Sequence, residues 1–147
     1  GDTFSEDGHV LAAMIRKCHA AKVAGTPEVA FWGSGRQRRQ FLYVEDLAAV
    51  AVEIMQSPAF TEWGPLLNVA GHPARRLDDV AENVADVVGY TGRIRWDTTK
   101  AEGTTRKELL GGWAFPAPPT LLRAGVKQTY DWYQAKVAHL PQGQNRG

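Results

Sequence analysis

The stretch that decides the fold runs from residue 29 to residue 48 and reads VAFWGSGRQRRQFLYVEDLA. The apolar run over 29–32 predicts a strand, and the glycines that follow it predict a turn. A second apolar run over 41–44 predicts another strand. From residue 47 the apolar side chains recur at helical spacing, which predicts a helix that ends at Ser57-Pro58. Strand, turn, strand and helix in this order indicate a mixed α/β domain.

The rest of the chain supports the same fold class. We expect one α/β domain over residues 1–141, with a small mixed sheet and about four helices, followed by a disordered tail over 142–147. Apolar periodicity predicts further helices from residue 9 to about 24, over 77–88 and from 121 to about 140, and further strands over 66–70 and 93–97.

Composition excludes several classes of protein. The chain has 147 residues and a formal net charge of +1, which gives no overall field toward nucleic acid or anionic membranes. No apolar run is long enough to span a membrane. The single cysteine, Cys18, excludes an internal disulfide and a multi-cysteine metal site, and it lies on an apolar helical stripe. We therefore expect a cytoplasmic protein with an inert core thiol and no metal.

The turn after residue 32 is the richest candidate site. Its two glycines let the backbone approach a ligand closely, and Trp32 offers a flat face to a base or sugar. The nearby Arg36, Arg38 and Arg39 offer planar donors to phosphate oxygens. Composition alone favours another interpretation, in which the tryptophan is buried beside a solvated basic turn.

Two more groups of polar residues are weaker candidates. His9 and Lys17 share one face of the first predicted helix, about 12 Å apart, and could serve the two ends of an elongated ligand. The loop from Asp97 to Lys107 carries hydroxyls, a glycine and the cations Lys100 and Arg106, a composition suited to a diphosphate. The alternatives are a helix-start histidine with a solvated lysine, and an ordinary exposed polar loop.

Taken in order, these segments resemble the C-terminal, substrate-binding half of the GDP-L-fucose synthases. Those enzymes belong to the extended short-chain dehydrogenase/reductase family of NAD-dependent epimerases and dehydratases. The resemblance covers the chain to about Lys136. Its main motifs are Gly8-His9-Val10, Trp32-Gly33-Ser34-Gly35, Arg39 through Ala48, Asn68-Val69, Val87-Val88-Gly89-Tyr90, Trp96-Asp97, Gly103 through Lys107 and Thr129 through Tyr133.

The resemblance implies roles for individual residues. His9 matches the family's acid/base histidine in epimerisation, and Lys17 matches a basic residue at the nucleotide diphosphate. Trp32 and Arg39 match residues that hold the GDP part. The remaining substrate wall is matched by Asp97, Lys100, Arg106 and Lys107.

The resemblance also implies a missing half. The sequence has no glycine fingerprint for a dinucleotide and no tyrosine followed four residues later by lysine, since Tyr133 and Lys136 are one residue too close. We therefore expect no cofactor in this chain, although the full-length family uses NADP, and no reduction by this chain alone. Without a Rossmann cofactor domain, Val50, Ile54 and Leu67 would be exposed, which predicts a homo-oligomer or a separate Rossmann-domain partner.

Three functions remain open at this stage. The chain could bind a GDP-sugar without catalysis. It could instead be one part of a split GDP-4-keto-6-deoxy-mannose epimerase/reductase that is active with an N-terminal partner. A third alternative is an oligomeric scaffold that binds no ligand.

Overall fold

The computed structural model describes residues 9–58, 66–100, 102–109 and 119–138 of the chain. Helices and short strands alternate in this part, which confirms the mixed α/β class. In chain order the elements are α1 (Val10–Ala24), β1 (Glu28–Trp32), β2 (Arg38–Arg39), α2 (Val44–Gln56), β3 (Arg75–Arg76), α3 (Leu77–Val88), β4 (Arg93–Asp97), β5 (Arg106–Lys107) and α4 (Leu122–Ala138).

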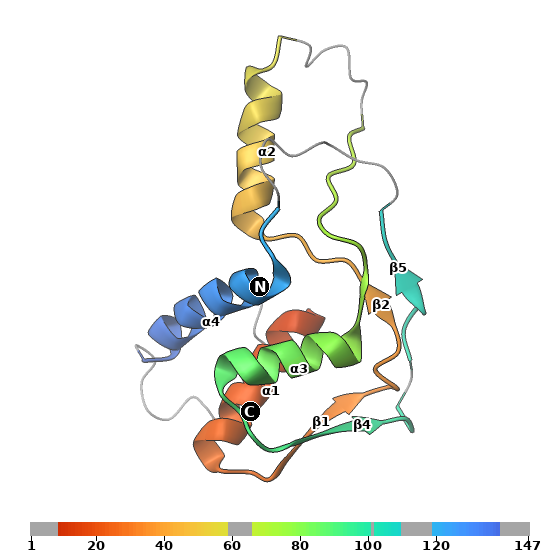
Figure 1. Ribbon diagram of the computed structural model, residues 1–147, viewed down its shortest axis with the longest axis vertical. Helices are drawn as coiled ribbons and strands as arrows, with labels where there is room; N and C mark the ends of the chain where they lie inside the picture. Colours follow the sequence, from red (N-terminus) through yellow and green to blue (C-terminus); the bar gives the residue numbers. More distant parts are fainter. Residues whose placement is uncertain (1–8, 59–65, 101, 110–118, 139–147) are drawn as a thin grey trace.

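Three helices and one strand pair surround the main core (Figure 1). Helix α3 packs between α1 and α4, and β1 lies against α1. The core-facing side chains recur at the predicted helical spacing, and Ile15, Val84 and Val126 are among the most deeply buried. The predicted strand over 93–97 is confirmed as β4, which pairs in parallel with β1.

The expected small sheet is divided into two. The β1–β4 pair forms the first, and the second has the order β3-β2-β5. Strand β2 pairs antiparallel with β3 and parallel with β5, so the second sheet is mixed. Each of its strands is only two residues long.

The predicted strand over 41–44 is wrong. Residues 41–43 form no strand, and α2 begins at Val44. The side chain of Gln40 provides a physical reason, because it takes the hydrogen bonds that a continuing ladder would need. Its Oε1 accepts from the Leu109 amide at 3.0 Å, and its Nε2 donates to the Gly71 carbonyl at 3.4 Å. The ladder therefore stops at Arg39.

The predicted strand over 66–70 is also wrong, since this segment has no regular structure. A strand needs a neighbour for its backbone groups, and no described segment pairs with this one. The apolar composition alone therefore did not suffice to form a strand here. Both Leu66 and Leu67 are exposed.

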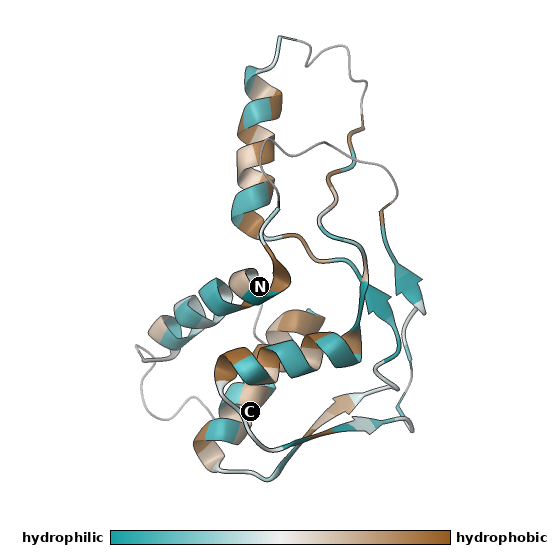
Figure 2. Ribbon diagram, viewed as in Figure 1, coloured by the Kyte–Doolittle hydropathy of each residue, from teal (hydrophilic) through white to brown (hydrophobic). Residues whose placement is uncertain are grey.

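Helix α2 stands apart from the three core helices (Figure 1). Figure 2 shows brown, hydrophobic bands along it even so. Its first turn is anchored, because the Asp46 carboxylate accepts hydrogen bonds from the Thr120 amide at 2.7 Å and hydroxyl at 2.8 Å. The prediction that Val50 is exposed is wrong, because Val50 is the buried side chain of α2. It lies on the side of the helix turned away from solvent.

None of the helices in the described residues is both long and apolar enough to cross a membrane. The predicted tail over 142–147 lies outside the described residues.

Candidate functional site

The predicted glycine turn is present at the end of β1. Gly33 has a φ of 83° and Gly35 a φ of 75°, a backbone region that favours glycine. The Gly33 amide donates to the Asp97 carbonyl at 2.9 Å, which extends the contact between β1 and β4. Gly35 lies directly against the Trp96 ring, where a Cβ on Gly35 would come within 2.6 Å of Trp96 Cε2. The turn is thereby held in one position against the end of β4.

Trp32 is exposed beside this turn, so the interpretation of a buried tryptophan is wrong. Its exposed fraction is 67% although it ends a strand whose Val29 and Phe31 are buried. The Lys17 Nζ lies 5.9 Å from the centroid of the Trp32 ring, and the Lys100 Nζ lies 6.0 Å from it. Both distances suit cation–π contacts. An exposed aromatic face with a cation from α1 and another from the 98–105 loop can receive a planar or sugar ring together with a negative charge.

Arg39 holds the 98–105 loop against β2. Its Nη1 donates to the carbonyls of Arg38 at 2.8 Å and Thr104 at 2.7 Å. The Gly103 backbone comes close enough that a Cβ there would lie 3.3 Å from Arg39 Nη2. Lys107 lies beside Arg39 in register on β5 and is exposed. The structure therefore brings together Arg39 and Lys107, two predicted site residues from distant parts of the sequence.

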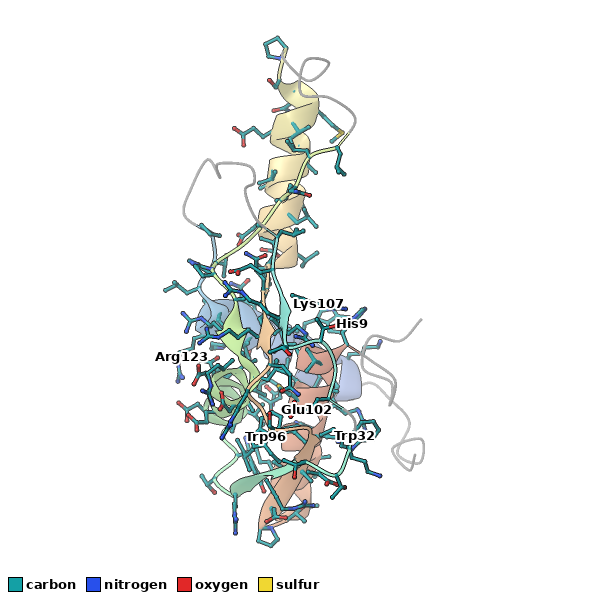
Figure 3. The ribbon with its side chains drawn as sticks, turned by 90° about the vertical axis from the view of Figure 1, so that its right-hand side faces the viewer. His9, Trp32, Trp96, Glu102, Lys107 and Arg123 are labelled. Atoms are coloured by element: carbon teal, nitrogen blue, oxygen red, sulfur yellow. The ribbon has the colours of Figure 1, made fainter. Side chains whose placement is uncertain are left out.

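The predicted diphosphate loop is tied to the glycine turn by a carboxylate. The Glu102 Oε1 accepts a hydrogen bond from the Ser34 amide at 2.6 Å. Figure 3 shows Trp32, Glu102 and Lys107 on the side of the molecule along which β4 is connected to β5. The sequence did not predict this contact, because nothing in the spacing of Ser34 and Glu102 indicates that the two segments meet.

Asp97 and Arg106 are engaged by the protein itself. The Asp97 carboxylate accepts from the Thr99 hydroxyl at 2.6 Å and amide at 3.1 Å, and these bonds lower the pKa of Asp97. Arg106 Nε donates to Glu108 at 2.8 Å. The pKa of Glu108 is lowered by the hydrogen bond from the Ala74 amide and, next, by Arg106. Both predicted residues therefore organise their own loop, and direct ligand contact by either one stays a prediction.

His9 lies at the N-cap position of α1 and is exposed. The helix is confirmed, with Lys17 eight residues after His9, and their shared face stays a prediction. Among the described residues, no hydrogen bond or ion pair joins the His9 side chain to another titratable group. Its role as an acid/base group stays a prediction.

Cys18 is buried in the described core, and His19 and His72 each lie within hydrogen-bonding distance of a neighbouring group. Cys18 is fully buried, and burial raises the pKa of its thiol to about 11. His19 Nδ1 lies 3.0 Å from the Tyr130 hydroxyl, and His72 Nε2 lies 2.9 Å from the Pro119 carbonyl. The described part of the chain contains no group of three potential metal ligands. His139 lies outside it.

Sequence reasoning missed Arg75. This residue of β3 lies directly beside Arg39 in the sheet register and is exposed. Two consecutive arginines at positions 75 and 76 could have indicated an anion-binding segment. Its place next to Arg39 depends on an antiparallel pairing of two-residue strands, which no sequence pattern predicts.

Comparisons with known proteins agree with this fold. Residues 1–70 match the model of the NAD dependent epimerase/dehydratase family. GDP-L-fucose synthase 1 of Arabidopsis thaliana is 39% identical over 91% of this chain and 42% of its own length. GDP-L-fucose synthase of Escherichia coli is 35% identical over 86% of this chain and also 42% of its own length.

A solved structure gives the same result. The crystal structure of a GDP-L-fucose synthetase from Naegleria fowleri superimposes with a TM-score of 0.75 and 26% identity, covering 93% of this chain and 42% of that one. The chain thus spans about two fifths of the length of the relatives that it matches. The chain is therefore similar to part of the GDP-L-fucose synthases, and its residues 1–70 match the NAD dependent epimerase/dehydratase family.

Proposed function

We propose that this chain binds a GDP-linked sugar. The observation that carries the proposal is the exposed Trp32 ring, which has the Nζ atoms of Lys17 and Lys100 near it and lies beside a loop fastened by Arg39. A buried tryptophan would pack in the hydrophobic core, whereas the exposed Trp32 ring is free to stack on a ring of a ligand. The similarity to GDP-L-fucose synthases supports a GDP-sugar as that ligand.

The described groups suit the parts of such a molecule. Trp32 would stack on one of its rings, a contact worth about 1–3 kcal/mol when an aromatic side chain stacks on a base. Lys17 and Lys100 lie over the same ring and would attract the diphosphate. Arg39 and Lys107, in register on neighbouring strands, would bind its oxygens with charge-assisted hydrogen bonds.

Binding, rather than reduction by this chain alone, is the function we propose. The sequence has neither the tyrosine–lysine pair nor the glycine fingerprint that hydride transfer in the family requires. His9 would then contact the sugar without completing a catalytic cycle. A turnover assay with GDP-4-keto-6-deoxy-mannose and NADPH tests this distinction, since NADPH oxidation by the purified chain would contradict it.

Isothermal titration with GDP-L-fucose tests the binding itself. We expect saturable heat for the unaltered chain and an affinity at least fivefold weaker for Trp32→Ala, because a stacking contact of about 1 kcal/mol or more is lost. Trp132→Ala is the matched control, since Trp132 is also exposed and also carries a lysine, Lys136, at 5.1 Å from its ring. The proposal fails if GDP-L-fucose at millimolar concentration gives no heat, or if both variants lose affinity equally.

We further propose that an apolar surface on α2 receives a cofactor-binding domain. Val44, Leu47, Val52 and Met55 of α2 are all exposed. Segment 66–70 also has exposed leucines and no strand partner among the described residues. Apolar side chains and unpaired backbone groups together suit docking against a sheet edge and its covering helices.

Sedimentation velocity separates this partner from self-association. We expect self-association of the chain alone, because the same surface can pair with a second copy. Met55→Glu should weaken it, whereas Val23→Glu should not, since Val23 is an exposed apolar residue on α1, away from that surface. Addition of the N-terminal half of a GDP-L-fucose synthase should displace the second copy. A monodisperse monomer that does not bind this half would contradict the proposal.

A further inference from the structure

The second sheet consists entirely of cationic residues. Its three strands are Arg38–Arg39, Arg75–Arg76 and Arg106–Lys107. The register places Arg39 between Arg75 and Lys107, and it places Arg38 between Arg76 and Arg106. Residues directly opposite each other on neighbouring strands project to the same face of a sheet. The six cations therefore form two rows of three on opposite faces.

The row that contains Arg38 is compensated by carboxylates. Arg76 forms an ion pair with Asp78, and Arg106 forms one with Glu108. Arg38 donates to the Ala74 carbonyl at 3.3 Å, and its charge helps to lower the pKa of Glu108. Two carboxylates thus face three cations in this row.

The row that contains Arg39 has no such compensation among the described residues. Arg39 donates to the carbonyls of Arg38 and Thr104, which are neutral. Arg75 and Lys107 are exposed, and no described carboxylate forms an ion pair with either one or with Arg39. Like charges directly opposite each other on neighbouring strands destabilise a sheet. A bound anion would relieve that repulsion.

The space beside Arg75 is open. Arg75 lines a cavity of about 80 Å³ whose other walls include Leu11 of α1, Phe41 and Gly125 of α4. Leu11 lies two residues after His9, so this cavity begins near the first turn of the helix that carries the predicted acid/base group.

We infer that Arg75, Arg39 and Lys107 form a single anion site for a ligand with at least two linked phosphoryl groups, in which Arg75 is a further binding residue. Arg75 and Lys107, the outer residues of the row, are separated by two strand spacings of about 4.8 Å each. Two linked phosphates therefore reach all three side chains better than a single phosphate does. The inference rests on the proposed function, because Arg39 and Lys107 belong to both. It adds a third cation, from β3, that neither the motifs nor the resemblance indicated.

Inorganic pyrophosphate is the probe, with orthophosphate for comparison, in isothermal titrations at fixed ionic strength. We expect pyrophosphate to bind more tightly than orthophosphate, and Arg75→Gln to weaken pyrophosphate binding about tenfold because a charge-assisted hydrogen bond is lost. Arg76→Gln removes the same charge from the neighbouring residue on the opposite face and should change the affinity less than twofold. Arg75→Lys should recover part of it. Equal losses in Arg75→Gln and Arg76→Gln, or no loss in Arg75→Gln, would overturn the inference.

A second measurement needs no variant and is therefore independent of folding defects. Phenylglyoxal modifies exposed arginines, and mass spectrometry reports the rate at each position. We expect pyrophosphate to slow modification of Arg75 and Arg39 in the unaltered chain while Arg93, on β4, keeps its rate. Equal rates at Arg75 with and without pyrophosphate would overturn the inference.

The two proposals fail differently. Trp32→Ala should weaken GDP-L-fucose binding without changing pyrophosphate binding. If GDP-L-fucose does not bind but pyrophosphate protects Arg75, the anion site stands and the sugar-nucleotide ligand is wrong. If GDP-L-fucose binds with equal affinity to the unaltered chain and to Arg75→Gln, the proposed function stands and Arg75 is not part of the site.

Discussion

The Glu102 carboxylate lies 2.6 Å from the Ser34 backbone nitrogen and accepts its hydrogen bond. The glycine turn would otherwise present this amide to a phosphate, so the protein places one of its own negative charges where a ligand's charge would go. The contact is exposed, and it also fastens the 98–105 loop over the turn. Glu102 would therefore compete with an anionic ligand that binds at this turn.

Removal of this charge should strengthen anion binding. We expect Glu102→Ala to raise the affinity for pyrophosphate about two- to fivefold, in keeping with the modest energy of an exposed charge interaction. Isothermal titration measures the change. Glu82→Ala, an exposed carboxylate on α3, is the control for net charge. An equal gain in the control would mean that only the overall charge matters.

Two glycines with similar backbone conformations should respond differently to substitution. Gly25 and Gly35 have φ angles of 65° and 75°, but only Gly35 lies against a ring, that of Trp96. Gly25→Ala should lower the free energy of unfolding by about 1–2 kcal/mol through backbone strain alone. Gly35→Ala should add an overpacking cost of about 1–3 kcal/mol. Urea unfolding followed by circular dichroism measures both variants, and equal losses would contradict the packing of the turn on Trp96.

His19 should make stability depend on pH. Burial lowers its pKa from the ordinary 6.5, and the nearby Lys22 lowers it further. The unfolded chain then binds a proton at higher pH than the folded chain does. The free energy of unfolding should therefore fall as the pH drops through 6.5, and the loss should level off below the lowered pKa of the folded state. Tyr130 and Tyr133 pack against the ring from α4.

Unfolding titrations between pH 5 and 8 measure this dependence. His19→Gln should flatten the slope near pH 6. The lowered pKa values of Asp78, Asp97 and Glu108 act at more acidic pH, below the ordinary carboxyl values of 3.8 and 4.5. An unchanged slope in His19→Gln would show that the half-buried His19 imidazole is not its source.

Cys18 should be unreactive in the folded chain. Its thiol is fully buried and its pKa is raised to about 11, so little thiolate is present at pH 8. We expect negligible labelling by iodoacetamide until urea unfolds the protein, after which one equivalent should react. Fast labelling without urea would mean that α1 opens readily from the core.

Local patterns predicted the helices well. Side chains such as Val80 and Val84 recur at helical spacing, and the glycines after α1 and α3 end both helices where the sequence indicates. The strand β4 follows from its own alternation, and its partner β1 from a short apolar run. Each of these elements is determined by neighbours close in sequence.

The second sheet and the site depend on contacts between distant residues. Nothing in the sequence near Arg39 shows that Arg75 pairs with it, or that Thr104 accepts its hydrogen bond. The apolar run at 41–44 predicts a strand, but the side chain of Gln40 satisfies the backbone groups that would have paired. Trp32 illustrates the same limit, since its exposure depends on the end of β1 and not on its residue type.

The bond between Asp46 and Thr120 anchors α2 at its first turn. A helix of 13 residues is near the length below which isolated helices are marginal in water, so the far end should open most easily. Amide hydrogen exchange should then show a gradient along α2, with rates rising from Asp46 toward Gln56. A helix anchored at one end unfolds progressively from the other end. A partner docked along α2 would slow exchange at the far end, so a flatter gradient would report that docking.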